Sequence, residues 1–169
     1  MPNVTKLSHA VLFISDLERS RPFYEKAFGL EYVAGRPGAA FFRIPGGEDH
    51  HNLALMEVGA GAPVPSQGSV GLYHLAWEVD TIDALAAAIE PLVEMGALVG
   101  ASDHGATKSL YGKDPDGIEF EILWRVPRED WGEWENSVTT RPLNLQAELA
   151  RFGKQDLLEP ASAAESGSF

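Results

Sequence analysis

The chain has 169 residues, of which 44% are hydrophobic and 22% charged, and its formal net charge is −12. This composition is ordinary for a globular protein large enough to bury a core, and the negative charge argues against nucleic acid and anionic membranes as partners, because clustered Lys and Arg bind both. The absence of cysteine from the sequence excludes disulfides, thiolate metal sites and a cysteine nucleophile.

The amino-terminal sequence MPNVTK lacks the charged-then-apolar pattern of a secretory signal. No apolar run in the sequence approaches the roughly 20 residues that a membrane-spanning helix needs. We therefore expect a soluble protein in the cytoplasm.

The first part of the chain follows the order strand, helix and three strands. Residues 7–14 (LSHAVLFI) form an apolar run with one histidine, which is typical of a buried strand. Asp16 can begin a helix and Gly29 can end it. Three β-prone segments separated by turns rich in Gly and Pro follow, at residues 30–34, 39–44 and 53–58. The pattern predicts a βαβββ module over residues 7–58.

The same order returns after a linker. Residues 59–71 (GAGAPVPSQGSVG) contain few side chains that could pack, and this composition is typical of a linker. The second module, residues 72–124, begins with a strand that again holds one histidine. Thr81 caps its helix, which Pro91 should kink or split. Three strand candidates complete this module, at residues 97–101, 109–111 and 118–124.

The rest of the chain has a different character. Residues 125–152 contain Pro127, Trp131 and Trp134 among polar residues, which indicates an irregular strap that packs its tryptophans on the core. The strap should end in a short helix at its carboxyl side. The last stretch, residues 153–169, is too small and polar to bury anything, and we expect a disordered tail. The fold class is therefore α+β, with a single domain over residues 1–124.

The two modules can be laid on each other. His9 falls on His74 at an offset of 65 residues, and the glycines that end the two helices are 67 residues apart. An offset of 67 also places Ala54 on Glu121. The two histidines therefore occupy equivalent strands and should converge between the sheets.

Two histidines and one carboxylate on strands form the facial triad that holds Fe(II) and leaves coordination positions open. His9, His74 and Glu121 supply these three groups. Ala54 cannot coordinate, so substrate and O₂ would have room. A single histidine in an apolar strand is more often a hydrogen-bonded core residue, but two at matching positions favour a metal site. Glu119 is expected to be solvated or paired at a strand end.

This arrangement resembles the vicinal oxygen chelate superfamily, also called the glyoxalase/bleomycin resistance/dioxygenase superfamily. The resemblance covers residues 7–124 and implies two tandem βαβββ modules that form a cupped mixed β-sheet. The superfamily includes glyoxalase I, methylmalonyl-CoA epimerase, fosfomycin-resistance enzymes, bleomycin-binding proteins and extradiol dioxygenases. The fold alone therefore does not choose the function.

A longer motif resembles that of the extradiol dioxygenases. The motif begins with His104, which is followed after five residues by an aliphatic residue and Tyr111. It continues through the turn DPDG at residues 114–117 and ends at Glu121, the position of the metal ligand in that family. The turn alone is a weak signal, because many superfamily members have it, whereas the combination with the histidine and the tyrosine is far more specific. One departure is Ser102, where the family pattern has Gly, Asn, Thr, Ile or Val.

A second stretch, HHNLAL at residues 50–55, resembles the family's short strand whose histidine lies over the metal as acid–base catalyst. The match implies His51 in that role, with His50 as the open alternative. The resemblance also implies that Tyr111 hydrogen-bonds a substrate oxygen and that His104 orients the substrate or Tyr111.

The resemblance as a whole implies a small extradiol, catechol 2,3-type dioxygenase of aromatic catabolism. Such an enzyme is a non-haem oxidoreductase that opens a catecholic ring with O₂ beside the two hydroxyls. The implied cofactor is Fe(II), with Mn(II) as the alternative, and the implied partners are an aromatic diol, O₂ and, by analogy with other short members, a second copy in a homodimer. The sequence leaves open whether the site closes within one chain or between two chains.

Two rival functions remain open from the sequence. A metal-dependent isomerase or lyase of the glyoxalase or epimerase type would need a fourth ligand, and Ala54 cannot supply one; Glu57 could do so only if the register differed by one. A non-catalytic protein that binds aromatic drugs would need no triad, and the five histidines would then be unexplained.

Overall fold

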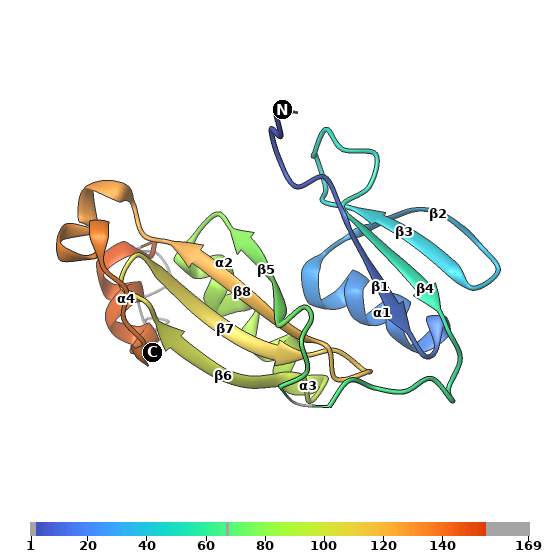
Figure 1. The fold of residues 1–169 in the computed structure, drawn as a ribbon. Coiled ribbons are helices and arrows are strands. Elements are labelled where there is room, and N and C mark those ends of the chain that lie inside the picture. The colour runs from blue at the N-terminus through green and yellow to red at the C-terminus, as the bar shows by residue number, and fades with distance from the viewer. Residues whose placement is uncertain (1–2, 67, 155–169) are drawn as a thin grey trace, which may run out of the picture.

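The chain folds into two modules that lie side by side and share the order βαβββ (Figure 1). The computed structural model describes residues 3–66 and 68–154. The first module, blue to teal in Figure 1, consists of β1 (Ala10–Ile14), α1 (Leu17–Phe28), β2 (Glu31–Arg36), β3 (Ala39–Arg43) and β4 (Leu53–Glu57).

The second module and the strap follow in the green to red part of the ribbon. The module consists of β5 (His74–Val79), α2 (Ile82–Ala87), α3 (Ile89–Glu94), β6 (Leu98–Asp103), β7 (Thr107–Lys113) and β8 (Glu119–Arg125). The strap then forms two 3-10 turns, η1 (Arg128–Asp130) and η2 (Gly132–Asn136), the short strand β9 (Arg141–Pro142) and the helix α4 (Leu145–Phe152).

Each module has its own mixed sheet, which confirms the α+β class and the repeated module order. The strand orders are β1-β4-β3-β2 and β5-β8-β7-β6-β9. In both sheets the first strand of the module pairs in parallel with its last strand, and the remaining pairs are antiparallel.

The strand registers confirm that Ala54 and Glu121 are equivalent. Val11, two residues after His9, pairs with Ala54. Ala76, two residues after His74, pairs with Glu121. The predicted superposition of the modules is therefore correct at the position that decides the number of metal ligands.

Local sequence explains where the helices begin and end. Asp16 caps α1 by accepting a hydrogen bond from the Arg19 amide, and Gly29 ends the helix with a left-handed φ of 62°. The helix of the second module is split, as predicted: α2 and α3 meet at Ala88, and Pro91 in the first turn of α3 has no N–H to continue the helical ladder. Pro22 lies inside α1 and has no N–H to donate to the carbonyl of Glu18, an exposed residue.

Each sheet has one face covered by helices and one open face. Alternate residues point to opposite faces, so Leu12 and Ile14 of β1 are buried whereas Val11 and Phe13 are 51% and 71% exposed. The helices α1, α2 and α3 pack on the covered faces. The open faces carry the candidate functional residues.

The DPDG turn joins the two modules. Asp114 accepts backbone hydrogen bonds from residues 116 and 118, as expected for such a turn. Its other oxygen accepts a hydrogen bond from the Tyr24 hydroxyl of α1 at 2.9 Å, and Asp116 pairs with Arg19 at 2.6 Å. The turn therefore docks the strand that carries Glu121 against the helix of the first module.

The described residues between β4 and β5 form neither helix nor strand. The predicted domain boundaries stay a prediction, and residues 155–169 of the predicted disordered tail lie outside the described residues. Within residues 3–66 and 68–154, no helix has the length and apolar character needed to cross a bilayer. The cytoplasmic location also stays a prediction.

Candidate metal centre

Two of the three predicted ligands meet on the open face of the second sheet. His74 begins β5 and Glu121 lies on the neighbouring strand β8. The parallel pairing of these strands brings His74 Nε2 within 3.1 Å of Glu121 Oε2. An imidazole nitrogen and a carboxylate oxygen at this distance are typical donors for Fe(II) and Mn(II).

Tyr111 and His104 extend this pair. Tyr111 lies opposite Glu121 in the β7–β8 pairing, and its hydroxyl is 3.2 Å from Glu121 Oε1. Burial, followed by the charge and the hydrogen bond of Glu121, raises the pKa of Tyr111 to about 12, so the phenol stays protonated. His104 Nε2 lies 2.8 Å from the same hydroxyl. A chain of contacts therefore runs from His104 through Tyr111 and Glu121 to His74.

The first module brings the other two predicted residues together. His9 lies directly before β1 and is exposed, and its ring centroid is 4.6 Å from that of His51. His51 is half-buried against Phe41, whereas His50 is exposed. Burial, together with His9 and His50, lowers the pKa of His51, which favours the neutral imidazole that can accept a proton.

A single chain does not complete the triad. Among the described residues, no three His, Asp or Glu side chains form a group that could hold a metal ion. His9 belongs to the open face of the first sheet, and His74 and Glu121 belong to that of the second. The predicted meeting of all three between the sheets is therefore not seen within one chain.

The donor set of the second module fits a divalent metal in a further respect. His74 Nδ1 is buried without a hydrogen-bond partner, and the nearest carboxylate oxygen, Glu119 Oε1, is 3.8 Å away. A metal-bound histidine usually donates its second N–H to such a carboxylate. The place of Glu119 beside the candidate ligand His74 was not predicted. Tyr73, whose ring is tilted by 46° to that of His74 with the centroids 4.8 Å apart, was also missed.

The fourth ligand of a glyoxalase-type site is missing from the described strands of the first module. Ala54 occupies the position equivalent to Glu121. Glu57, which could serve only if the register differed by one, accepts a hydrogen bond from the Leu17 amide at 2.8 Å and so helps to cap α1 instead. His9 is therefore the candidate ligand that the described part of the first module offers.

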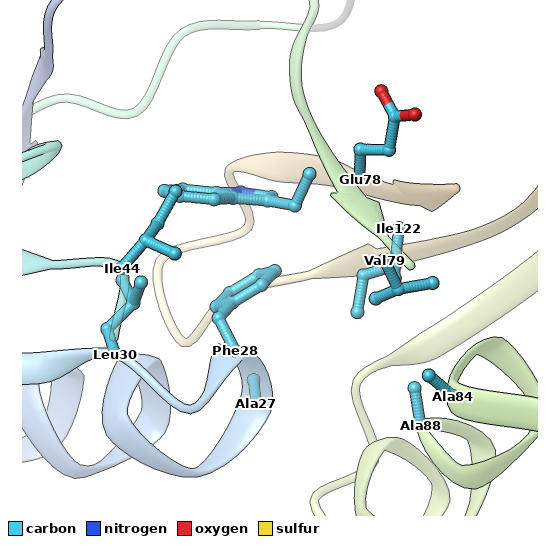
Figure 2. Close-up of a pocket in the computed structure, with 10 residues that line it drawn as sticks. Ala27, Phe28, Leu30, Ile44, Glu78, Val79, Ala84, Ala88 and Ile122 are labelled. Carbon is cyan, nitrogen blue, oxygen red and sulfur yellow. The ribbon is translucent and has the colours of Figure 1, made fainter. Parts of the chain in front are cut away.

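A pocket of about 240 Å³ lies elsewhere, where the end of α1 meets the second module. Figure 2 shows Phe28 and Ile44 of the first module on one side of it and Val79, Ala84 and Ala88 of the second on the other. None of the five histidines lines it, and the carboxylate of Glu78 points away from it. The pocket is therefore separate from the candidate metal centre.

Comparison with known proteins gives the family. The family model described as Glyoxalase/Bleomycin resistance protein/Dioxygenase superfamily matches residues 6–122. The chain is 30% identical over 155 residues to a catechol-2,3-dioxygenase of Bacillus subtilis (strain 168), covering 89% of this chain and 53% of that protein. It is 32% identical over 125 residues to biphenyl-2,3-diol 1,2-dioxygenase 2 of Rhodococcus globerulus, covering 72% of this chain and 65% of that protein.

Other relatives have different activities, and the fold is shared more widely. A lactoylglutathione lyase of Neisseria meningitidis serogroup A is 28% identical over 74% of this chain and 94% of that protein. The crystal structure of a glyoxylase/bleomycin resistance protein/dioxygenase domain from Frankia sp. EAN1pec, 24% identical, covers 73% of this chain and 100% of that chain with a TM-score of 0.64. The chain spans only about half to two thirds of the length of the two dioxygenases. The chain belongs to the glyoxalase/bleomycin resistance protein/dioxygenase superfamily.

Proposed function

We propose that this protein is a non-haem, metal-dependent extradiol dioxygenase that opens a catecholic ring beside its two hydroxyls. The observation that carries the proposal is the contact chain from His104 through Tyr111 to Glu121. A glyoxalase-type reaction needs neither His104 nor Tyr111. Such a site also uses a fourth ligand, and Ala54, which cannot coordinate a metal, stands at that position. The names of the two dioxygenase relatives support the same choice.

We further propose that the active form is a homodimer, in which His9 of one copy completes the site formed by His74 and Glu121 of the other. One chain alone does not form a group of three ligands among its described residues. Both open faces also leave large apolar side chains in water, including Phe13 at 71% and Tyr73 at 75% exposure. A two-fold dimer that packs the first sheet on the second would cover these side chains and form two equivalent sites.

His9, His74 and Glu121 would hold Fe(II), or Mn(II) as the alternative. The bound metal would lower the pKa of a coordinated catechol hydroxyl and offer an open position to O₂. His51, whose pKa is lowered, can accept the proton that the catechol releases. Tyr111, protonated at neutral pH, can hold a substrate oxygen in place by hydrogen bonding.

The direct test is oxygen uptake by protein loaded anaerobically with Fe(II) and given a panel of simple and substituted catechols. We expect one O₂ consumed per ring opened and a yellow ring-fission product. Iron-loaded protein that turns over no catechol in the panel would contradict the proposal. Isomerase or lyase activity with Zn or Ni in place of Fe or Mn would support the glyoxalase-type alternative instead.

A further inference from the structure

The strap reaches the candidate site through a backbone carbonyl. Thr139 lies between η2 and β9, and its carbonyl oxygen is 2.8 Å from His104 Nδ1. We propose that the strap sets the tautomer and orientation of His104 through this contact, and thereby aims the hydroxyl of Tyr111. The catalytic consequence rests on the proposed dioxygenase function, whereas the structural contact does not.

The chemistry of the contact assigns the proton. A carbonyl oxygen only accepts hydrogen bonds, so Nδ1 of His104 must carry the hydrogen. Thr140 Oγ1, at 3.4 Å from the same nitrogen, is the more distant neighbour. In the neutral imidazole, Nε2 then has a lone pair and accepts the hydrogen bond of the Tyr111 hydroxyl at 2.8 Å.

This arrangement determines what Tyr111 offers to a ligand. Its single hydroxyl hydrogen has two acceptors within reach, His104 Nε2 at 2.8 Å and Glu121 Oε1 at 3.2 Å. The Nδ1–H tautomer leaves Nε2 of His104 as an acceptor, so His104 competes with Glu121 for this hydrogen. The Nε2–H tautomer would instead donate to Tyr111 and leave Glu121 as the acceptor of the hydroxyl hydrogen, so the tautomer of His104 decides which way the hydroxyl is aimed.

The strap is anchored on both sides of Thr139. On the carboxyl side, β9 pairs with β6, and Arg141 forms an ion pair with Asp103 at 2.9 Å. On the amino side, the Trp134 ring packs on Gly105 so closely that a Cβ at residue 105 would lie 2.4 Å from it. Figure 1 shows this orange part of the ribbon beside the β6–β7 end of the second sheet. These anchors make Trp134 and Arg141 positioning residues for His104.

The variants for the test follow from the anchors. Trp134→Ala removes the packing on Gly105. Arg141→Met removes the ion pair with Asp103, together with the guanidinium that lies 4.8 Å from the centroid of the Trp134 ring. Trp134→Phe keeps an aromatic ring there and should rescue the contact. Arg128→Met is the matched control, because Arg128 pairs with Glu135 at the exposed surface of the strap and does not contact His104.

Two readouts separate the strap from the proposed function. The first is ¹⁵N NMR of the histidine rings in metal-free protein, with His104 assigned by its loss in His104→Gln. We expect the Nδ1–H tautomer in the native chain, Trp134→Phe and Arg128→Met, and a shift toward the Nε2–H tautomer in Trp134→Ala and Arg141→Met. The second readout is turnover of a catechol substrate at equal metal content, where kcat should fall about 10-fold or more in the last two variants, with KM changing less.

The outcomes are distinct. The inference would be overturned if His104 of the native protein lacked the Nδ1–H tautomer. It would also be overturned if His104 kept that tautomer in both Trp134→Ala and Arg141→Met. So would a normal kcat in a variant whose tautomer has changed. If the tautomers behave as expected while the native protein turns over no catechol, the strap contact stands and the dioxygenase proposal fails.

Discussion

His50 and His51 are adjacent in sequence but differ in their surroundings. His51 is half-buried between His9 and Phe41, and His50 is exposed. If His51 accepts the substrate's proton, His51→Asn should lower kcat by at least about 100-fold while metal content is kept. His50→Asn, as the matched control, should lower it only slightly. Metal analysis alongside steady-state kinetics checks both, and loss of metal from His51→Asn would make His51 a ligand instead.

Asp103 is the residue on which the strap's ion pairs converge. It bonds Lys108 at 2.5 Å and Arg141 at 2.9 Å, and Lys108 is only 5% exposed. Asp103→Asn would leave the buried ammonium with Glu148 at 3.5 Å as its remaining acidic partner, and should cost roughly 3 kcal/mol of unfolding free energy.

Urea denaturation measures this cost. Glu78→Gln provides the comparison, because Glu78 pairs with Arg125 at 2.9 Å where both side chains are about half exposed. The free energy of unfolding of Glu78→Gln should fall by less than about 1 kcal/mol. Equal losses in the two variants would show that burial of Lys108 does not decide the strength of this network.

Several residues of the candidate site could be predicted from the sequence because they combine a chemical group with a repeat position or a motif. His9, His74 and Glu121 are of this kind. Thr139 could not be predicted, because the group that matters is a backbone carbonyl, which every residue has. Glu119 was expected only at a strand end. Its closeness to His74 could not be predicted, because it depends on the parallel pairing of two strands far apart in sequence.

At the scale of elements, the DPDG turn has a second role as the junction between modules. Asp116 accepts hydrogen bonds from the backbone and hydroxyl of Ser15 and pairs with Arg19. Burial acts to raise its pKa, but the hydrogen bonds from Ser15 and the charge of Arg19 outweigh it, and the pKa of Asp116 is lowered from 3.8. The ionised carboxylate therefore stabilises the folded state.

The pH dependence follows from that sign. A lowered pKa means that the stabilisation is fully present well above 3.8 and is lost as the pH falls through the folded-state value. Asp116→Asn should therefore be less stable than the native chain at neutral pH, and the difference should shrink below about pH 4. Urea midpoints of both proteins measured across this range test it, and a difference that grows on acidification would refute the assigned sign. Asp114 responds oppositely, since burial raises its pKa.

The order of the elements could be predicted because each has a local signal. The caps Asp16 and Thr81, the break at Pro91 and the alternation of β8 are examples. β9 could not be predicted, because its two residues are too few for any periodic pattern. The contact of Asp116 with α1 was also missed, since it joins residues about a hundred positions apart.

At the scale of the whole molecule, the open faces are the dominant feature. Each sheet packs its helices on one face only, and the histidines and carboxylates lie on the other. An alternating strand pattern shows that a face is to be covered or used, but it does not show whether the covering sheet belongs to the same chain. This is why the sequence left open whether the triad forms within one chain or between two, whereas in the structure His9 lies on a different open face from His74 and Glu121.

The central claim is that a metal-dependent dioxygenase site forms between two copies of the chain. Its most direct measurement is the activity of a heterodimer of His9→Ala and Glu121→Gln chains, carrying different affinity tags and purified through both. Each variant alone should be inactive, because every site lacks one ligand. The heterodimer should have one intact site of two and about half of the native activity per dimer. A doubly purified heterodimer that binds Fe(II) no better than its parents and opens no catechol would contradict the account.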